Sequence, residues 1–122
     1  MARVVGRMKG RTSFRALARP DGRARRGPLS VAYKASGPDA PDTPPFPVVG
    51  YAVGRRNGSA VRRNRLRRRL RAATRLCAAQ LAHGTYLVRA EPPAAEAPFD
   101  ELCRALREAA LAASGARRGV RS

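Results

Sequence analysis

A dense run of arginines between residues 55 and 75 is the part of the sequence best suited to bind a charged ligand. It holds ten basic residues and no acidic one. Guanidinium groups bind phosphate groups through two parallel hydrogen bonds, a geometry that lysine does not offer. Asn57 and Gly58 predict a turn, and Ser59 can cap a helix that begins after it. The run therefore predicts a basic helix that binds phosphate groups.

The start of this expected helix carries an electrostatic conflict. Arg62 and Arg63 fall in its first turn, where positive charge opposes the helix dipole. An anion bound at a helix N-terminus is stabilised, and no acidic residue three or four positions away answers the two arginines. A solvated basic face is the plainer interpretation of most charge runs. Here a phosphate partner is favoured because it removes the conflict.

Side chains for a self-sufficient enzyme are missing from the sequence. His83 is the only histidine, and its place beside Gly84 favours a helix-end residue over a catalytic base. The eight acidic residues are scattered, whereas two-metal phosphoryl chemistry needs clustered carboxylates. Cys77 and Cys103 are interpreted as small core residues on two different helices. We expect no catalytic residue and no metal ligand in the protein.

The net charge restricts the class of partner. The 122 residues include 26 Lys and Arg against 8 Asp and Glu, a formal net charge of +18. A compact domain with that charge repels itself, so a polyanionic partner is expected, nucleic acid first and an anionic membrane surface second. No stretch approaches the roughly 20 apolar residues of a membrane span, and the N-terminus has no apolar run typical of a signal peptide. We expect a cytoplasmic protein without a membrane partner.

The pattern of apolar residues predicts one α+β domain. Its expected elements are a short helix at 12–19, strands at 29–33 and 48–54 joined by a proline-rich loop at 37–47, a helix from 59 to about 81, a strand at 85–90 and a helix from 99. Gly84 is expected to end the long helix. The expected domain occupies residues 10–113, between a basic extension at 1–9 and a basic flexible tail at 114–122.

Each element has an expected core face. The long helix has an apolar stripe, formed by Leu66, Leu70, Ala73, Cys77 and Leu81, and its opposite face carries Asn64, Arg68, Arg71 and Arg75 with Arg65 and Arg67 on the shoulders. In the strand at 48–54, Val49, Tyr51 and Val53 are expected in the core. The alternate positions are nearly bare, so a ligand could approach the backbone there. The last helix has a stripe of Phe99, Leu102, Leu106, Ala110 and Ala113.

The basic segment resembles the bacterial ribonuclease P protein component. The family has an Arg-Asn-Arg core inside a basic helix, preceded by a strand, two basic residues, a glycine and Ala-Val. The matching runs here are Val49-Gly50-Tyr51-Ala52-Val53-Gly54-Arg55-Arg56 and Gly58-Ser59-Ala60-Val61-Arg62-Arg63-Asn64-Arg65-Leu66-Arg67-Arg68. A weaker resemblance extends from about Gly10 to Ala113. It implies the fold α-β-β-β-α-β-α, similar to a domain of a ribosomal protein, with a left-handed crossover at the basic helix.

The resemblance also implies a function and its residues. Family members form a 1:1 ribonucleoprotein endonuclease that removes the 5′ leader of precursor tRNA, and the catalytic RNA subunit holds the Mg²⁺ ions. The residues expected to bind the RNA are Arg55, Arg56, Arg62, Arg63, Asn64, Arg65, Arg67, Arg68 and Arg71. The residues expected to line a leader-binding cleft are Phe14, Tyr33, Gly50, Ala52 and Gly54. This sequence departs from the family pattern at Ala18, where a second phenylalanine is usual, and at Gly54, where a serine is usual.

Two other classes of protein are also compatible with the charge. A ribosomal protein or RNA chaperone on the same architecture explains the basic composition equally well, but it predicts no specific Arg-Asn-Arg helix. A peripheral membrane protein would need bulky apolar anchors on its basic helix, whereas the stripe here is Leu, Ala and Cys. The RNA that copurifies with the protein would separate the three classes. Without it, the resemblance favours the ribonuclease P protein.

Overall fold

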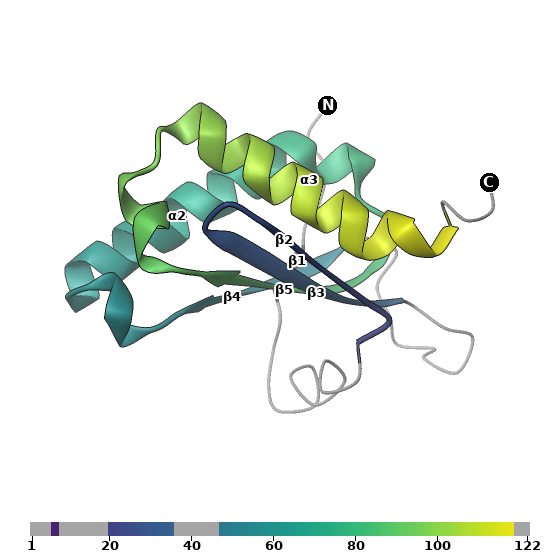
Figure 1. Ribbon diagram of the computed structural model, residues 1–122, viewed down its shortest axis with the longest axis horizontal. Helices are drawn as coiled ribbons and strands as arrows, with labels where there is room; N and C mark the ends of the chain where they lie inside the picture. Colours follow the sequence, from purple (N-terminus) through teal and green to yellow (C-terminus); the bar gives the residue numbers. More distant parts are fainter. Residues whose placement is uncertain (1–5, 8–19, 36–46, 119–122) are drawn as a thin grey trace.

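The computed structural model describes residues 6–7, 20–35 and 47–118. They form a mixed sheet of five strands: β1 (Gly6–Arg7), β2 (Gly22–Arg26), β3 (Leu29–Ala35), β4 (Val48–Val53) and β5 (Gly84–Ala90). The strand order is β1-β4-β5-β3-β2. Two helices, α2 (Ala60–Cys77) and α3 (Phe99–Arg118), pack together on one face of this sheet (Figure 1). The expected mixed α+β domain is confirmed.

The connection through α2 is the feature of the topology that positions the basic helix. β4 and β5 lie side by side and run parallel, with Val49 opposite Tyr86 and Val53 opposite Ala90. Parallel neighbours require a crossover, and α2 supplies it. β5 then pairs antiparallel with β3, and β3 with β2. The crossover at the basic helix is thus present, while its left-handedness stays a prediction from the resemblance.

Three expected boundaries are corrected by the structure. α2 ends at Cys77 and is followed by a short 3₁₀ turn at Ala78–Gln80, so the α-helix is shorter than predicted. Gly84 does not end the helix but begins β5, with a φ of 145°. α3 continues to Arg118, beyond the predicted start of the tail at 114. Ser114 lies inside α3, where its buried hydroxyl donates to the Ala110 carbonyl.

Other expected elements were missed or lie outside the described residues. β2 was not predicted from periodicity, since Gly22–Arg26 offers only Ala24 as an apolar side chain. The two-residue β1 was not predicted either. The expected helix at 12–19 and most of the proline-rich loop fall outside the described part of the chain. The strands predicted at 29–33, 48–54 and 85–90 are confirmed as β3, β4 and β5.

The core lies between the sheet and the two helices. All five residues of the predicted α2 stripe are buried, and so are Leu102, Leu106, Ala110 and Ala113 of α3. Phe99 is the exception, because the first residue of α3 is partly exposed. Both cysteines lie on helices as expected, Cys77 buried and Cys103 half-buried. Burial raises the pKa of the Cys77 thiol to about 11, so the thiol stays protonated at neutral pH and is a poor nucleophile.

Two glycines allow close packing around this core. A side chain on Gly22 would meet the backbone carbonyl of Ala113, so α3 rests directly on β2. A Cβ on Gly84 would lie 2.6 Å from both the Tyr33 ring and the Lys34 carbonyl. Its positive φ also favours glycine. Gly84 therefore serves close contact with β3, and the expectation that it ends the long helix is wrong.

We predict that Leu70→Ala destabilises the domain by about 2–5 kcal/mol, because it removes a fully buried side chain and leaves a cavity. Urea denaturation followed by circular dichroism measures the change. The matched control is Arg68→Ala on the exposed side of α2, which should change the free energy of unfolding by less than about 0.5 kcal/mol. Equal losses in the two variants would show that the faces of α2 are assigned wrongly.

Candidate nucleic-acid interface

The basic segment begins with a fixed turn and a capped helix. Arg55–Asn57 form a 3₁₀ turn, and Gly58 leaves it with a φ of 107°. The Ser59 hydroxyl accepts a hydrogen bond from the backbone N–H of Arg62, which confirms the predicted cap. No acidic residue lies in the first turn of α2. The helix N-terminus therefore presents both its dipole and the adjacent arginines to an anion.

Asn57 holds this turn against the sheet. Its side chain is buried, and its amide nitrogen donates to the carbonyls of Gly54 and Ala90, each at 3.2 Å. These carbonyls stand at the ends of β4 and β5. The contact joins the segment that carries Arg55 and Arg56 to two strands. The sequence indicated only a turn at Asn57; the bond to a residue 33 positions away has no local signal.

The predicted RNA-binding residues of α2 differ in what they contact. Arg65 and Arg68 are exposed, and within the described part of the chain neither has a hydrogen bond or an ion pair. Arg67 donates to Asn64 Oδ1 at 2.8 Å and to the Val53 carbonyl at 3.4 Å. These contacts hold the Arg67–Asn64 pair against the end of β4. Arg75, outside the predicted set, is likewise exposed and without such a contact in the described residues, so three arginines of α2 remain accessible to a ligand.

Two further arginines of the predicted set are partly used within the protein. The Arg63 Nε donates to the Gly58 carbonyl at 3.2 Å, which tightens the start of the helix. The Arg71 guanidinium lies 5.9 Å from the centre of the Tyr51 ring, within range of a cation–π interaction. The Tyr51 hydroxyl in turn donates to Thr74. Burial raises the pKa of Tyr51 above its usual value, so the ring stays neutral beside Arg71.

Arg69 has a structural role that charge alone did not reveal. Its guanidinium donates to the carbonyls of Ala94, Ala95 and Ala97, which belong to the segment between β5 and α3. A guanidinium has no acceptor function and several donors, so one arginine can donate to three carbonyls, of which that of Ala94 also accepts from the backbone N–H of Ala97. The spacing of Arg69 on the helix, toward α3 and away from Asn64 and Arg68, was the available signal.

The same segment brings carboxylates to two of the predicted RNA-binding residues. Glu91 lies 3.5 Å from Arg56, and Glu96 lies 3.7 Å from Arg62. Both arginine side chains remain more than half exposed. The acids come from a distant part of the sequence, so the search at three and four positions along the helix did not find them. Exposed pairs of this kind contribute little to stability.

Of the five residues predicted for the leader-binding cleft, the four that the structure describes do not share one face of the sheet. Tyr33 lies in the core at 5% exposure, its ring packs 4.9 Å from the Tyr86 ring, and its hydroxyl donates to the His83 carbonyl. Gly50 and Ala52 lie on the opposite face of the sheet, because they alternate with the core residues of β4. Gly54 is exposed beyond β4, and Phe14 is outside the described residues. A leader contact for Tyr33 and Phe14 stays a prediction.

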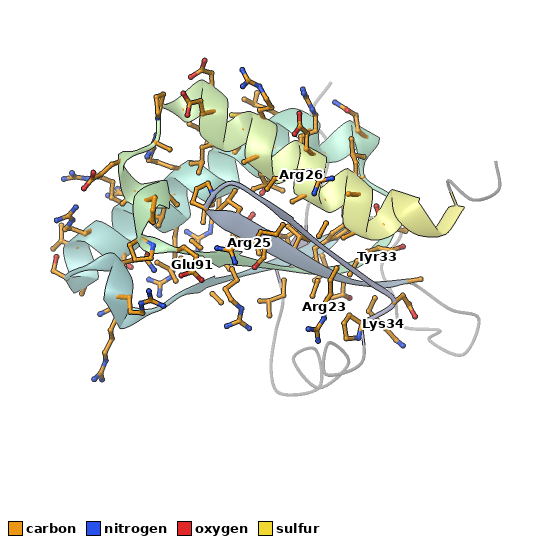
Figure 2. The ribbon with its side chains drawn as sticks, in the orientation of Figure 1. Arg23, Arg25, Arg26, Tyr33, Lys34 and Glu91 are labelled. Carbon is orange, nitrogen blue, oxygen red and sulfur yellow. The ribbon has the colours of Figure 1, made fainter. Side chains whose placement is uncertain are left out.

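The face of the sheet away from the helices carries arginines that the sequence reasoning missed. Arg23 and Arg25 of β2 and Arg89 of β5 line an open hollow of about 360 Å³ together with Ser30, Ala32 and Leu87. The register places Arg25 opposite Ser30 and Ser30 opposite Arg89, so two arginines flank a small residue across three strands. Figure 2 shows Arg23 on this open side and Arg26 on the side of α3. The alternation Arg-Ala-Arg in β2 was the missed signal.

The described residues contain neither a helix that could span a membrane nor a group of side chains that could hold a metal ion. None of the helices described is long and apolar enough to cross a membrane. In the same part of the chain, no three His, Cys, Asp or Glu side chains gather into a group that could hold a metal ion. The exposed guanidinium groups of both basic surfaces can bind phosphate groups.

Comparison with known proteins gives a consistent result. The ribonuclease P family model matches residues 4–114. The ribonuclease P protein component of Thermobifida fusca is 40% identical over 119 residues, covering 95% of this chain and 80% of that protein. The one from Brucella suis is 37% identical over 118 residues, covering 92% and 82%. A match to the Kocuria rhizophila protein is 46% identical over 66 residues, and spans 53% of this chain and 58% of that protein.

Solved structures agree on the fold. The RNase P protein of Staphylococcus aureus superposes with a TM-score of 0.67 at 18% identity, covering 84% of this chain and 90% of that one. The RNase P protein of Thermotoga maritima gives a TM-score of 0.67 at 21% identity, covering 84% and 92%.

We predict that substitution of two neighbouring arginines of α2 affects different properties, RNA binding for Arg68 and stability for Arg69. Arg68→Ala should weaken binding of a structured RNA and reduce the slope of log K against log salt by up to about 0.9, because one phosphate contact is lost. Arg69→Ala should instead lower the free energy of unfolding by about 1–3 kcal/mol, because three carbonyls each lose the hydrogen bond from its guanidinium. RNA titrations at several salt concentrations and urea denaturation measure the two effects. A stable Arg69→Ala protein with weakened RNA binding would contradict the assignment.

Proposed function

Because this chain belongs to the ribonuclease P protein family, we propose that it is the protein subunit that binds the catalytic RNA of ribonuclease P and assists removal of the 5′ leader from precursor tRNA. Members of the family are RNA-binding components of a tRNA-processing endoribonuclease complex. The observation that carries the proposal is the capped helix α2, which presents Arg65 and Arg68 free of contacts within the described residues. The phosphate groups of a structured RNA would provide anionic partners for these arginines.

The proposed division of labour leaves catalysis to the RNA subunit. Mg²⁺ supplies the chemistry of phosphodiester hydrolysis in the proposed complex, and we propose that the RNA holds it. The described residues offer no clustered carboxylates that fit such an ion. The raised pKa of Cys77 removes the buried thiol as a nucleophile. The protein's own contribution is therefore binding and orientation, in a 1:1 complex with the RNA.

The open face of the sheet is the surface we propose for the leader. Arg23, Arg25 and Arg89 can bind phosphates of an extended strand, while the small side chains of Ser30 and Ala32 leave room for its bases in the hollow. This proposal keeps the predicted contribution of Ala52, which is half-buried and lies beside Arg89 in the register, but not that of Gly50, which is buried. It adds arginines in place of a site built around Tyr33, whose hydroxyl and ring already have partners in the core.

We predict that the purified protein alone does not cleave precursor tRNA, and that adding the catalytic RNA of the same organism restores cleavage in Mg²⁺ at physiological salt. The measurement is a cleavage assay with precursor tRNA labelled at its 5′ end. RNA recovered with the protein from cells should include that catalytic RNA. Cleavage that scales with RNA-free protein, after contaminating nucleases are excluded, would overturn the proposal, as would recovery of ribosomal RNA alone.

A second prediction separates the open face from Tyr33. Arg23→Ala combined with Arg25→Ala should weaken precursor tRNA binding to the holoenzyme by about 1–3 kcal/mol and leave mature tRNA binding unchanged, since only the precursor carries a leader. Tyr33→Phe removes the hydroxyl that bonds to His83 and keeps the ring. It should affect stability more than leader affinity. Selective loss of precursor affinity in Tyr33→Phe, with none in the arginine variant, would return the leader site to Tyr33.

A further inference from the structure

The segment 91–97, between β5 and α3, lies along one side of the basic helix and is held there rigidly. Pro92 and Pro93 stiffen its backbone, Ala94 is fully buried, and the Arg69 guanidinium binds three of its carbonyls. The backbone N–H of Glu91 donates to the Pro28 carbonyl at 2.9 Å, which ties the segment to the turn between β2 and β3. The segment therefore has a defined position beside α2.

Its two carboxylates meet two arginines predicted to bind RNA. Glu91 lies 3.5 Å from Arg56, which precedes α2, and Glu96 lies 3.7 Å from Arg62, in its first turn. Two of the chain's 8 acidic residues thus lie beside predicted RNA-binding arginines. The Arg56, Arg62 and Glu96 side chains are exposed and Glu91 is a third exposed, so these pairs can be opened by a competing phosphate.

We propose that Glu91 and Glu96 limit the binding of RNA that does not fit this protein, by competing with phosphates for Arg56 and Arg62. An RNA laid across the 91–97 side of α2 must displace both carboxylates and then lie beside two unpaired negative charges. An RNA that fits the exposed Arg65–Arg68 side avoids most of that repulsion. Specificity is a difference between two affinities, and a like charge facing the wrong partner increases it.

This inference rests on the proposed function only for the identity of the fitting RNA. The cost to unrelated RNA follows from the ion pairs alone. Each arginine freed from its carboxylate can make one more phosphate contact, which steepens the salt dependence by up to about 0.9 in the log–log slope. The gain in affinity should be a few-fold for each acid removed, because exposed ion pairs are weak.

The experiment compares the full-length protein with Glu91→Gln, Glu96→Gln and the double variant. The matched control is Glu108→Gln, which makes the same charge change on the exposed side of α3 and, in the described part of the chain, removes no ion pair with α2. The probes are an RNA duplex of unrelated mixed sequence and the ribonuclease P RNA of the same organism. Binding is titrated at several salt concentrations, and thermal unfolding verifies that the variants stay folded.

We expect the double variant to bind the unrelated duplex about three- to tenfold more tightly, with a steeper salt slope, and Glu108→Gln to change it by less than about twofold. Affinity for the ribonuclease P RNA should rise less, so the preference for it should fall. A double variant that matches Glu108→Gln, binds the duplex more weakly, or gains equally on both RNAs overturns the proposal. A wild-type protein with no preference for ribonuclease P RNA counts against the proposed function, and the duplex comparison still decides whether the carboxylates oppose RNA.

Discussion

The contact between the apolar stripe of α2 and the core is the interaction on which the rest of the structure depends. α2 has no acidic residue and places arginines in its first turn, so the isolated helix would be destabilised by its own charge. Its stability must come from tertiary packing. Leu66, Leu70 and Cys77 are buried against the sheet and α3, and the Thr74 hydroxyl bonds to both Leu70 and Tyr51. When this stripe is buried, the arginines on the opposite side of α2 face the solvent. Folding of the domain therefore also exposes the positive charge of the helix.

The arginines of α2 make different contacts because each faces a different part of the protein. Arg69 faces the segment before α3 and completes its hydrogen bonds, whereas Arg71 rests near an aromatic ring of β4. Arg65 and Arg68 face outward. The number of basic residues therefore overstates how many guanidinium groups are available to RNA. The net charge of +18 indicates attraction to polyanions but does not show which surface binds them. The position of the binding surface depends on the sheet and on α3, because they determine which groups each guanidinium contacts.

Much of this arrangement could be predicted from the sequence, and the failures have physical causes. The period of 3.6 identified the buried face of α2, and the period of two identified the faces of β4. The same period places Tyr33 with Leu29 and Val31 on one face of β3, which is the core face in the structure. Grouping Tyr33 with Gly50 and Ala52 followed the family resemblance against that period. β2 was not predicted because three arginines surround its single apolar residue, so no alternation of apolar side chains is visible. The contacts of Asn57, Glu91 and Glu96 were not predicted because they join residues far apart in the sequence.

The basic surface of α2 and the basic surface formed by β2 and β5 lie on different sides of one sheet. This separation would allow a small protein to contact two RNA strands at once. α2 covers the face that holds the core, while Arg23, Arg25 and Arg89 lie on the other face. β5 is common to both, since Val88 packs in the core and Arg89 points the other way. Asn57 ties the start of the α2 region to the end of that same strand. In the proposed complex, an RNA bound at α2 and a strand bound at the open face would therefore be held at a separation set by a packed sheet. On that proposal the protein would act as a rigid spacer that orients the substrate, because correct placement alone removes much of the entropic barrier to a reaction.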